Sequence, residues 1–207
     1  MLPFVMLPRP LQESSVIGKG GSAGFLGKGY DPYVLYPEGD DMDMNKMDRI
    51  RTDDLQMRPD VFSVRLQRRA RLRDLVNREM AEIDKAVKHH NLDSYYEQAL
   101  SLIASGRARH AFDLAQEDEL IRDAYGRNTF GQSCLLARRL VEAGGPYIQV
   151  NWSKWVENIY DSRTDFGWDT HWLNFEHLVD RHGPILDRAL SGLLDDLRVS
   201  PKSGLAI

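Results

Sequence analysis

The chain has 207 residues, enough for the core of one ordinary domain, and its 42% hydrophobic and 28% charged residues exclude an intrinsically disordered protein. Its 27 basic and 31 acidic residues give a formal net charge of -4, which argues against a nucleic-acid-binding surface. No apolar run approaches the roughly 18 residues of a membrane span, and the single cysteine, Cys134, excludes an intramolecular disulfide.

The first segment, MLPFVMLPRPLQ, is apolar but interrupted by Pro3, Pro8 and Pro10. No basic leader precedes it and no small-residue cleavage site follows, so the pattern predicts an extended segment and no signal peptide. Residues 1–62 as a whole are rich in Gly, Pro and Asp, which predicts a long irregular region. Each Gly-Lys pair in it is followed by glycine, whereas a P-loop needs Ser or Thr opening a helix. We therefore favour a surface loop over a phosphate-binding loop.

Residues 63–125 are predicted to be a helical region. Leu72, Leu75, Val76, Met80, Ile83 and Val87 recur at the spacing of one apolar helix face, which predicts a helix over about residues 64–89. Further helices are expected over residues 93–104 and in the segment RARHAFDLA. The basic cluster Arg68, Arg69, Arg71 and Arg73 is followed by acidic residues, so it indicates a solvated helix surface more than a nucleic-acid patch.

Residues 126–199 carry the clearest pattern of the chain. In GQSCLLARRLVEAGGPYIQVNW a helix with Ser133 as its N-cap ends at Gly144, and a strand follows through Val150. A helix followed at once by a strand predicts an α/β fold with the helix packed on a sheet. Ligands of such sheets bind beyond the carboxyl ends of the strands. The segment that ends in WDTH comes directly after this strand.

Two more helices are expected, one over about residues 172–181 and one that begins at Pro184. The last residues, RVSPKSGLAI, offer only LAI as a further strand, so the central sheet is expected to be incomplete and residues 200–207 to be an atypical tail. We interpret residues 1–207 as a single partial domain.

The segment WDTH holds the best candidate for a functional site. In an extended segment residues two apart point to the same side, so Asp169 and His171 could direct an oxygen and a nitrogen at one metal ion. This pair suits Zn, Mn or Fe better than Ca. Catalytic zinc takes about three protein ligands, so a further ligand would have to come from Asp161, Asp165, Glu157 or elsewhere. The alternative is that Asp169 caps a helix starting at Trp172 and His171 packs among aromatic rings.

Other candidate residues are weaker. His171, His177 and His182 are spaced by six and five residues, which predicts that they scatter around a helix. Cys134 sits in an apolar helix and is expected to be a buried packing residue. No Gly-x-Ser-x-Gly nucleophile elbow occurs, so the catalytic residues are unknown.

The order of the motifs LPFVMLPRPL, GFLGKGYDPYVL, RLQRRARLRDLV, ARHAFDLAQEDELIRDAYGRNTFGQSCLLARRLVEAGGPYIQVNW and WDTHWLNFEHL resembles the bacterial domain-of-unknown-function family 1501, abundant in planctomycete-type genomes. The resemblance covers residues 2–197, and its most specific parts are residues 125–144 and 168–171. It implies the alkaline phosphatase and sulfatase superfamily, and hence a partial alkaline-phosphatase-like sandwich. It also implies that Asp169 and His171 bind a divalent metal, Zn or Mn, that acts on a phosphate or sulfate ester.

The chain departs from this family pattern at both ends. Relatives begin upstream with a strand that supplies a metal ligand and with the segment expected to hold the nucleophile, and they continue into a Gly-Glu-Phe-Gly-Arg-like motif and an Asp-His pair. The resemblance therefore implies a fragment of a metal-dependent hydrolase-like protein, with an incomplete site and no activity alone. Whether the chain is an enzyme stays open. Relatives are typically exported by a leader, so the localisation is open too.

Two alternatives remain. The chain could be a non-enzymatic module whose tryptophans, Trp152, Trp155, Trp168 and Trp172, stack on a carbohydrate or on a partner protein. Exposed tryptophans would favour that function and buried ones would favour core packing. A degenerate fragment without function is the other alternative.

Overall fold

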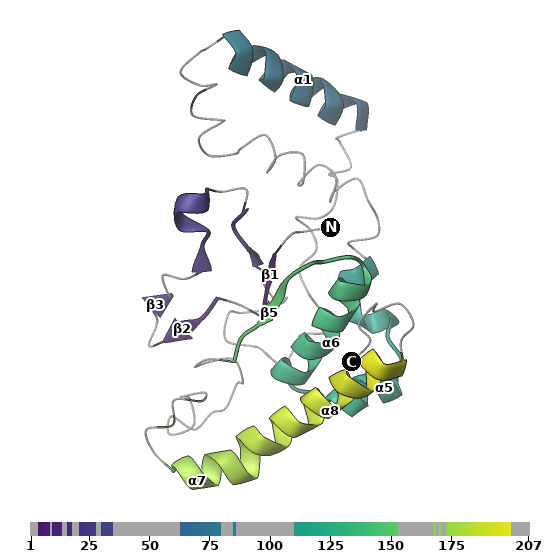
Figure 1. The fold of residues 1–207 in the computed structure, drawn as a ribbon. Coiled ribbons are helices and arrows are strands. Elements are labelled where there is room, and N and C mark those ends of the chain that lie inside the picture. Colours follow the sequence, from purple (N-terminus) through teal and green to yellow (C-terminus); the bar gives the residue numbers. More distant parts are fainter. Residues whose placement is uncertain are drawn as a thin grey trace.

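The computed structural model describes residues 4–8, 10–13, 16–17, 21–27, 30–34, 63–79, 85, 110–152, 168, 170 and 173–199. Helices predominate in these parts, and three strands form a small parallel sheet (Figure 1). This arrangement confirms the predicted helix-rich, partial α/β fold. Among the described residues, no helix is both long enough and apolar enough to cross a membrane.

The central strand of the sheet comes from the first segment of the chain. Strand β1 (Val5–Leu7) pairs in parallel with β4 (Tyr33–Val34) on one side and with β5 (Ile148–Val150) on the other. All its residues are buried, as expected for a parallel strand covered on both faces. The extended segment predicted there is confirmed, but its place between two strands was not predicted. A separate antiparallel pair joins β2 (Gln12–Glu13) to β3 (Val16–Ile17).

Helix α6 (Thr129–Glu142) follows the short helix α5 (Glu119–Tyr125). Asn128 is the N-cap of α6, and its side-chain oxygen accepts a hydrogen bond from the Gly131 backbone N–H at 2.8 Å. The prediction that Ser133 is the N-cap of this helix is therefore wrong. Ser133 lies one turn inside the helix, where its hydroxyl donates to the Thr129 carbonyl oxygen at 2.6 Å. The extended backbone at Asn128 supplies the cap geometry, so the helix starts earlier than predicted.

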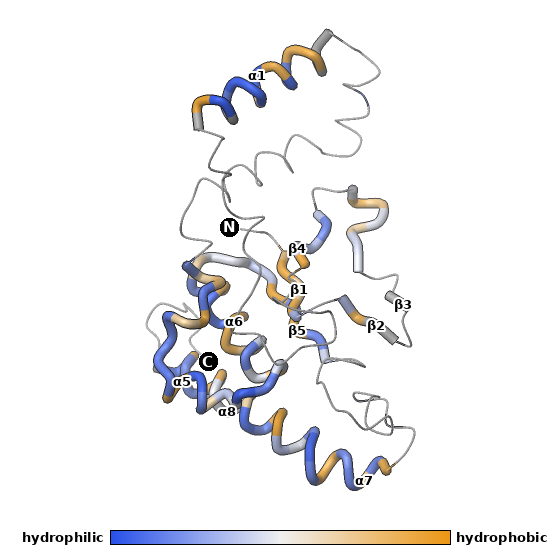
Figure 2. Tube along the Cα trace, turned by 180° about the vertical axis from the view of Figure 1, so that it is seen from behind, coloured by the Kyte–Doolittle hydropathy of each residue, from blue (hydrophilic) through white to orange (hydrophobic). Residues whose placement is uncertain are grey.

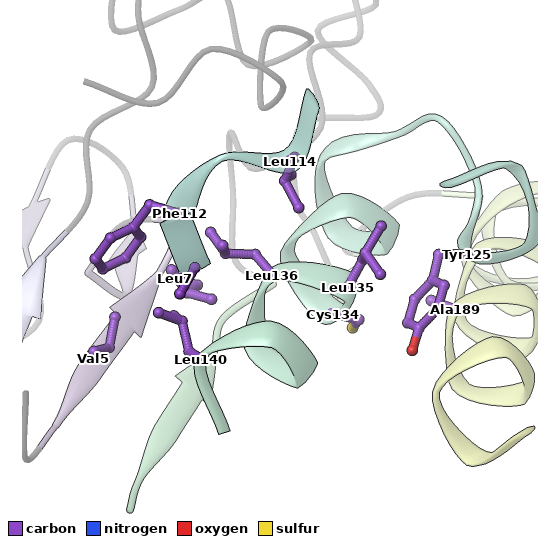
Figure 3. Packing of buried hydrophobic residues seen from close by; sticks show 11 residues of the cluster. Val5, Leu7, Phe112, Leu114, Tyr125, Cys134, Leu135, Leu136, Leu140 and Ala189 are labelled. Atoms are coloured by element: carbon purple, nitrogen blue, oxygen red, sulfur yellow. The ribbon is translucent and has the colours of Figure 1, made fainter. Parts of the chain in front are cut away.

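Both sides of α6 are buried (Figure 3). Leu136 and Leu140 point toward the sheet and Phe112, whereas Cys134 and Leu135 lie on the side of Tyr125 and of Ala189 from α8 (Gly183–Val199). Cys134 is 7% exposed, which confirms that it is a packing residue. Figure 2 shows hydrophobic residues gathered on β1 and β4, whereas hydrophilic and hydrophobic residues alternate along α8.

Helix α1 (Ser63–Glu79) confirms the start of the first predicted helix. Its residues Leu72, Leu75 and Val76, predicted to form an apolar stripe, are 62%, 57% and 44% exposed. Helix α1 lies apart from the sheet and α6 in Figures 1 and 2, so these side chains are not part of the described core. The helix predicted over residues 93–104 lies outside the described residues, as does most of the predicted extension of α1. A one-turn 3-10 helix, η2 (Gly24–Leu26), lies in the Gly-rich region, and a second one, η6 (Leu114–Gln116), precedes α5.

The two last predicted helices form one continuous element. Helix α7 (Asn174–His177) leads into the π-helical segment η7 (Leu178–His182), and η7 leads directly into α8. The predicted break before Pro184 is therefore wrong. The chain changes its helical pitch there instead of leaving the helix.

A charged network fixes the core helices to one another. The Tyr125 hydroxyl donates to Asp196 of α8 at 2.9 Å, and Arg138 of α6 pairs with Asp196 at 3.4 Å and with Glu117 at 2.8 Å. Burial raises the pKa of Tyr125, and the Asp196 carboxylate raises it further, so the hydroxyl stays a donor. Burial alone would raise the pKa of Glu117, but hydrogen bonds from Arg138 and Arg139 hold it below its usual value. Helices α5, α6 and α8 therefore meet at a network of opposite charges.

The Tyr125→Phe substitution tests this network. It removes the hydrogen bond that the Tyr125 hydroxyl of α5 donates to Asp196 of α8. We expect the free energy of unfolding to fall by about 1 kcal/mol. Urea denaturation measures the loss. Tyr147→Phe is the matched control because the Tyr147 ring is 57% exposed, and it should change stability much less. Equal effects of the two substitutions would contradict the role of the Tyr125 hydroxyl.

Candidate functional site

The carboxyl ends of β1 and β5 meet at one edge of the sheet. The Asn151 backbone N–H, directly after β5, donates to the Leu7 carbonyl oxygen at the end of β1 at 2.7 Å. The Asn151 side chain is buried, and its oxygen accepts a hydrogen bond from Gln149 at 2.7 Å. This edge is where parallel α/β sheets place their ligands.

An aromatic–histidine cluster lies beside this edge. It consists of Phe130, Trp152, Trp168, His177 and His182. Trp152 follows Asn151 directly, and its ring centroid lies 4.7 Å from that of Phe130 on α6, 5.2 Å from that of Trp168 and 5.2 Å from that of His182. The His182 ring also lies 5.2 Å from Trp168, at an interplanar angle of 32°. The cluster thus joins the strand end, the WDTH segment and η7.

The π-helical turn brings two histidines together. In an α-helix residues five apart lie on different sides, but a π turn bonds residue i to residue i+5 and places them one above the other. The Gly183 backbone N–H donates to the Leu178 carbonyl oxygen in this way. The ring centroids of His177 and His182 are 5.9 Å apart. For these two residues, the predicted scatter around a helix is wrong.

The sequence at the end of this turn explains its geometry. A Cβ atom at residue 183 would lie 2.6 Å from the Leu178 carbonyl oxygen, so the close approach there needs glycine. Pro184 has no N–H and cannot donate to the Asp180 carbonyl oxygen four residues earlier, as an α-helix requires. Gly183 and Pro184 together therefore favour the wider turn.

His182 is buried in an unusual state. It is 1% exposed, and neither of its ring nitrogens has a hydrogen-bond partner within the described part of the chain. Burial lowers the pKa of His182 to about 4, and the positive charges of Arg181 and His177 act in the same direction. The ring is therefore neutral at pH 7, and its one N–H and one lone pair have no partner among the described residues. Leaving a buried polar group unpaired costs about 1–3 kcal/mol.

The WDTH segment is described only at Trp168 and Thr170. Trp168 is 42% exposed, and the Thr170 hydroxyl donates to the Asn174 side-chain oxygen at 2.5 Å, which ties the segment to the start of α7. Leu173, which precedes α7, has a left-handed backbone with φ of 50°. Such a conformation is strained for leucine and costs about 1–3 kcal/mol. Strained residues of this kind cluster at functional sites.

The predicted ligands themselves, Asp169 and His171, lie outside the described residues, as do Asp161, Asp165 and Glu157. Of their neighbours in the chain, Trp168 packs against the His182 ring and Thr170 bonds to Asn174. The metal-binding role of Asp169 and His171 stays a prediction. Among the described residues, no group of three or more His, Cys, Asp or Glu side chains is arranged to hold a metal ion. Burial raises the pKa of the Cys134 thiol to about 12, so this residue is no nucleophile at neutral pH.

Sequence reasoning missed His182 as a residue of this site. The spacing of five between His177 and His182 argues against a shared face in an α-helix. The only sequence signal was Gly-Pro directly after His182, which interrupts the α-helical hydrogen bonding.

The His182→Phe substitution tests the buried neutral imidazole. The unfolded chain protonates this residue near pH 6.5, whereas the folded chain does so only near pH 4, so the free energy of unfolding falls as the pH drops between these values. Phe does not titrate. Between pH 7 and pH 4.5 the free energy of unfolding of the variant should therefore fall by about 1–3 kcal/mol less than that of the wild type. Urea denaturation at both pH values measures the difference. The exposed His110 provides the control His110→Phe, which should keep the wild-type pH dependence, and equal slopes in all three proteins would refute a buried neutral His182.

The Gly183→Ala substitution tests the π turn. The added Cβ atom would contact the Leu178 carbonyl oxygen, so we expect a loss of about 1–3 kcal/mol in unfolding free energy. Gly192→Ala in α8 is the matched control because its Cβ atom would meet ring carbons of Tyr125 at 3.2 Å and 3.3 Å, where a small shift suffices. Thermal unfolding compares the two variants. A Gly183→Ala variant as stable as Gly192→Ala would show that the turn does not need glycine.

A comparison with known proteins identifies the family. The family model described as "Protein of unknown function (DUF1501)" matches residues 1–200. No curated protein and no solved structure matches the chain. Since the family match covers nearly the whole chain, as the motifs in the sequence indicate, this chain belongs to the DUF1501 family of proteins of unknown function.

Proposed function

We propose that the chain is part of a metal-dependent, hydrolase-like protein of the alkaline phosphatase and sulfatase superfamily, and that Asp169 and His171 bind a divalent ion such as Zn or Mn. One observation carries this proposal. The Trp168 ring, one residue before Asp169, lies against Trp152, which is the second residue after β5. Trp168 is thereby held near the carboxyl edge of a parallel sheet, and α/β proteins bind their ligands at such edges, which supports the proposal.

The chemistry of the nearby side chains fits a metal ion. A carboxylate and an imidazole are ligands for Zn and Mn, and the unpaired nitrogens of His182 lie next to Trp168. When bound, such an ion polarises a phosphate or sulfate ester and activates a nucleophile. Among the described residues, Phe130 and Trp152 pack ring to ring beside the sheet edge and form an apolar surface there. The proposed substrate class is therefore a phosphate or sulfate ester.

The alternative, a module that stacks tryptophans on a carbohydrate or a partner protein, has weaker support. Trp152 is 9% exposed, and its ring is packed against Phe130, Trp168 and His182. A buried ring cannot stack on a ligand. Trp168 is 42% exposed and could do so, while Trp155 and Trp172 lie outside the described residues. We therefore favour the metal-binding function.

The double variant Asp169→Ala/His171→Ala tests the proposal by calorimetric titration with Zn²⁺ and with Mn²⁺. We expect the wild type to bind one of these ions and the variant to bind it at least about tenfold more weakly, because both ligands are lost. The double variant Asp187→Ala/His110→Ala removes the same two residue types from exposed positions and should bind like the wild type. Equal or negligible binding by the wild type and the Asp169→Ala/His171→Ala variant would refute the proposed ligands.

A further inference from the structure

We propose that this chain self-associates through two exposed helix surfaces, so that α1 of one copy docks on α7 and η7 of a second copy. One surface combines basic and apolar side chains, and the other combines acidic and apolar side chains. The inference does not depend on the proposed function, because neither surface includes the WDTH motif.

The first surface is the outer side of α1. We call it the basic face of α1 and define it by its exposed residues, which are Arg65, Arg68, Arg69, Leu72, Leu75 and Val76. These residues follow one another at intervals of three or four positions, so they lie on one side of the helix. The arginines thus share an exposed face with the residues that the sequence predicts as an apolar stripe.

The positive charge of this face is not neutralised by the helix itself. Asp74 is the only acidic residue between positions 64 and 76. It is partly buried, and it already accepts a hydrogen bond from Arg73 at 2.7 Å. Among the described residues, no carboxylate forms an ion pair with Arg68 or Arg69. The face therefore offers unpaired positive charge beside exposed apolar side chains.

The second surface lies on α7 and η7. We call it the acidic patch, and it consists of Phe175, Glu176, Val179 and Asp180, all of which are exposed. Phe175 and Val179 are 80% and 70% exposed. They stand two positions before and after the buried His177, so they point away from the core. In the described part of the chain, neither carboxylate of the patch has an ion-pair partner.

The two surfaces complement each other in charge and in hydrophobicity. Each presents two like charges next to large apolar side chains, and the charges of the two surfaces are opposite. Arginine and aromatic residues are enriched in protein interfaces. Opposite charges direct docking, whereas like charges placed against each other cost several kcal/mol. The basic face of α1 should therefore bind the acidic patch and should not bind a second basic face.

The position of the two surfaces favours a second copy as the partner. Figures 1 and 2 show α1 and α7 at opposite ends of the described structure, so the two surfaces of one copy do not meet. A second copy supplies the matching surface. Because each copy carries both surfaces, a twofold arrangement of antiparallel copies makes the same contact twice.

Other partners fit the basic face less well. Helices that lie on a membrane separate their basic and apolar side chains onto different faces. In α1, by contrast, Arg69 and Leu72 share one face, so lipid that covered the leucine would also cover the arginine. Proteins that bind single-stranded nucleic acid stack its bases on aromatic rings, and the basic face has none.

The test is the oligomeric state of the full chain, measured by analytical ultracentrifugation. We expect the wild type to form a dimer at about 100 μM protein, since interfaces of standard size reach at least micromolar affinity. The variants Arg68→Glu/Arg69→Glu and Glu176→Lys/Asp180→Lys each place like charges against each other. Each variant alone should therefore raise the Kd of the dimer at least about tenfold.

An equal mixture of the two variants is the decisive sample. In a mixed dimer the reversed α1 faces the reversed patch, and the native α1 faces the native patch, so opposite charges meet at both contacts. We expect the mixture to associate with a Kd near that of the wild type. The variant Asp187→Lys/Asp195→Lys reverses two exposed carboxylates of α8 outside the patch and should dimerise like the wild type.

Circular dichroism shows whether each variant is folded. Where a charge-reversal variant does not fold, the neutral variants Arg68→Gln/Arg69→Gln and Glu176→Gln/Asp180→Asn replace it and should also weaken the dimer. High salt should weaken the wild-type dimer too, because exposed charges are screened.

Four results would overturn the inference. The first is a wild type that stays monomeric, and the second is a dimer that either variant leaves unchanged. The third is a mixture of the two variants that does not associate. The fourth is a monomeric wild type that binds vesicles of phosphatidylserine and phosphatidylcholine and loses this binding in Arg68→Glu/Arg69→Glu, which would assign the basic face to a lipid surface.

Discussion

The burial of α6 on two opposite sides is the constraint on which the described structure depends. Leu136 and Leu140 pack toward the sheet and Phe112, while Cys134 and Leu135 pack on the side of Tyr125 and α8. A helix buried in this way cannot shift without opening both interfaces, because protein cores are close-packed. The charged network of Arg138, Glu117 and Asp196 then fixes the rotation of the helix between its neighbours. The sheet edge and α8 therefore keep fixed positions relative to each other.

That fixed spacing creates the candidate site. Strand β5 follows α6 through a short turn and ends beside β1, where Asn151 bonds to Leu7. Helix α8 crosses the other side of α6, and its preceding π turn carries His182 to the same edge. Phe130, in the first turn of α6, contacts Trp152 between them. The cluster is thus assembled by elements that pack on α6 and not by any local motif.

The site contains buried ring nitrogens without a hydrogen-bond partner among the described residues. Tyr125, Ser133 and Gln132 are buried polar residues whose side chains all form hydrogen bonds. In the aromatic–histidine cluster, by contrast, Trp152 and His182 have ring nitrogens without a hydrogen-bond partner among the described residues. Proteins violate packing and pairing rules mainly where function requires it. Arg138 also has buried nitrogens without a hydrogen bond among the described residues, but these lie within ion-pair distance of Glu117 and Asp196, whereas the rings of Trp152 and His182 are uncharged and have no such partner there.

The sequence alone determined the parts of the fold that depend on local pattern. The apolar spacing of Leu135, Leu136 and Leu140 predicted α6 as a helix, the glycines after it predicted its end, and the residues through Val150 predicted β5. The motif order predicted the family, and the WDTH motif gave the metal-ligand hypothesis, which the described residues do not test. Only the tertiary structure decided that the first segment is the central strand, because its partners β4 and β5 are distant in the sequence. It also decided that His177 and His182 share a face, because a π turn depends on backbone geometry and packing that residue spacing does not encode.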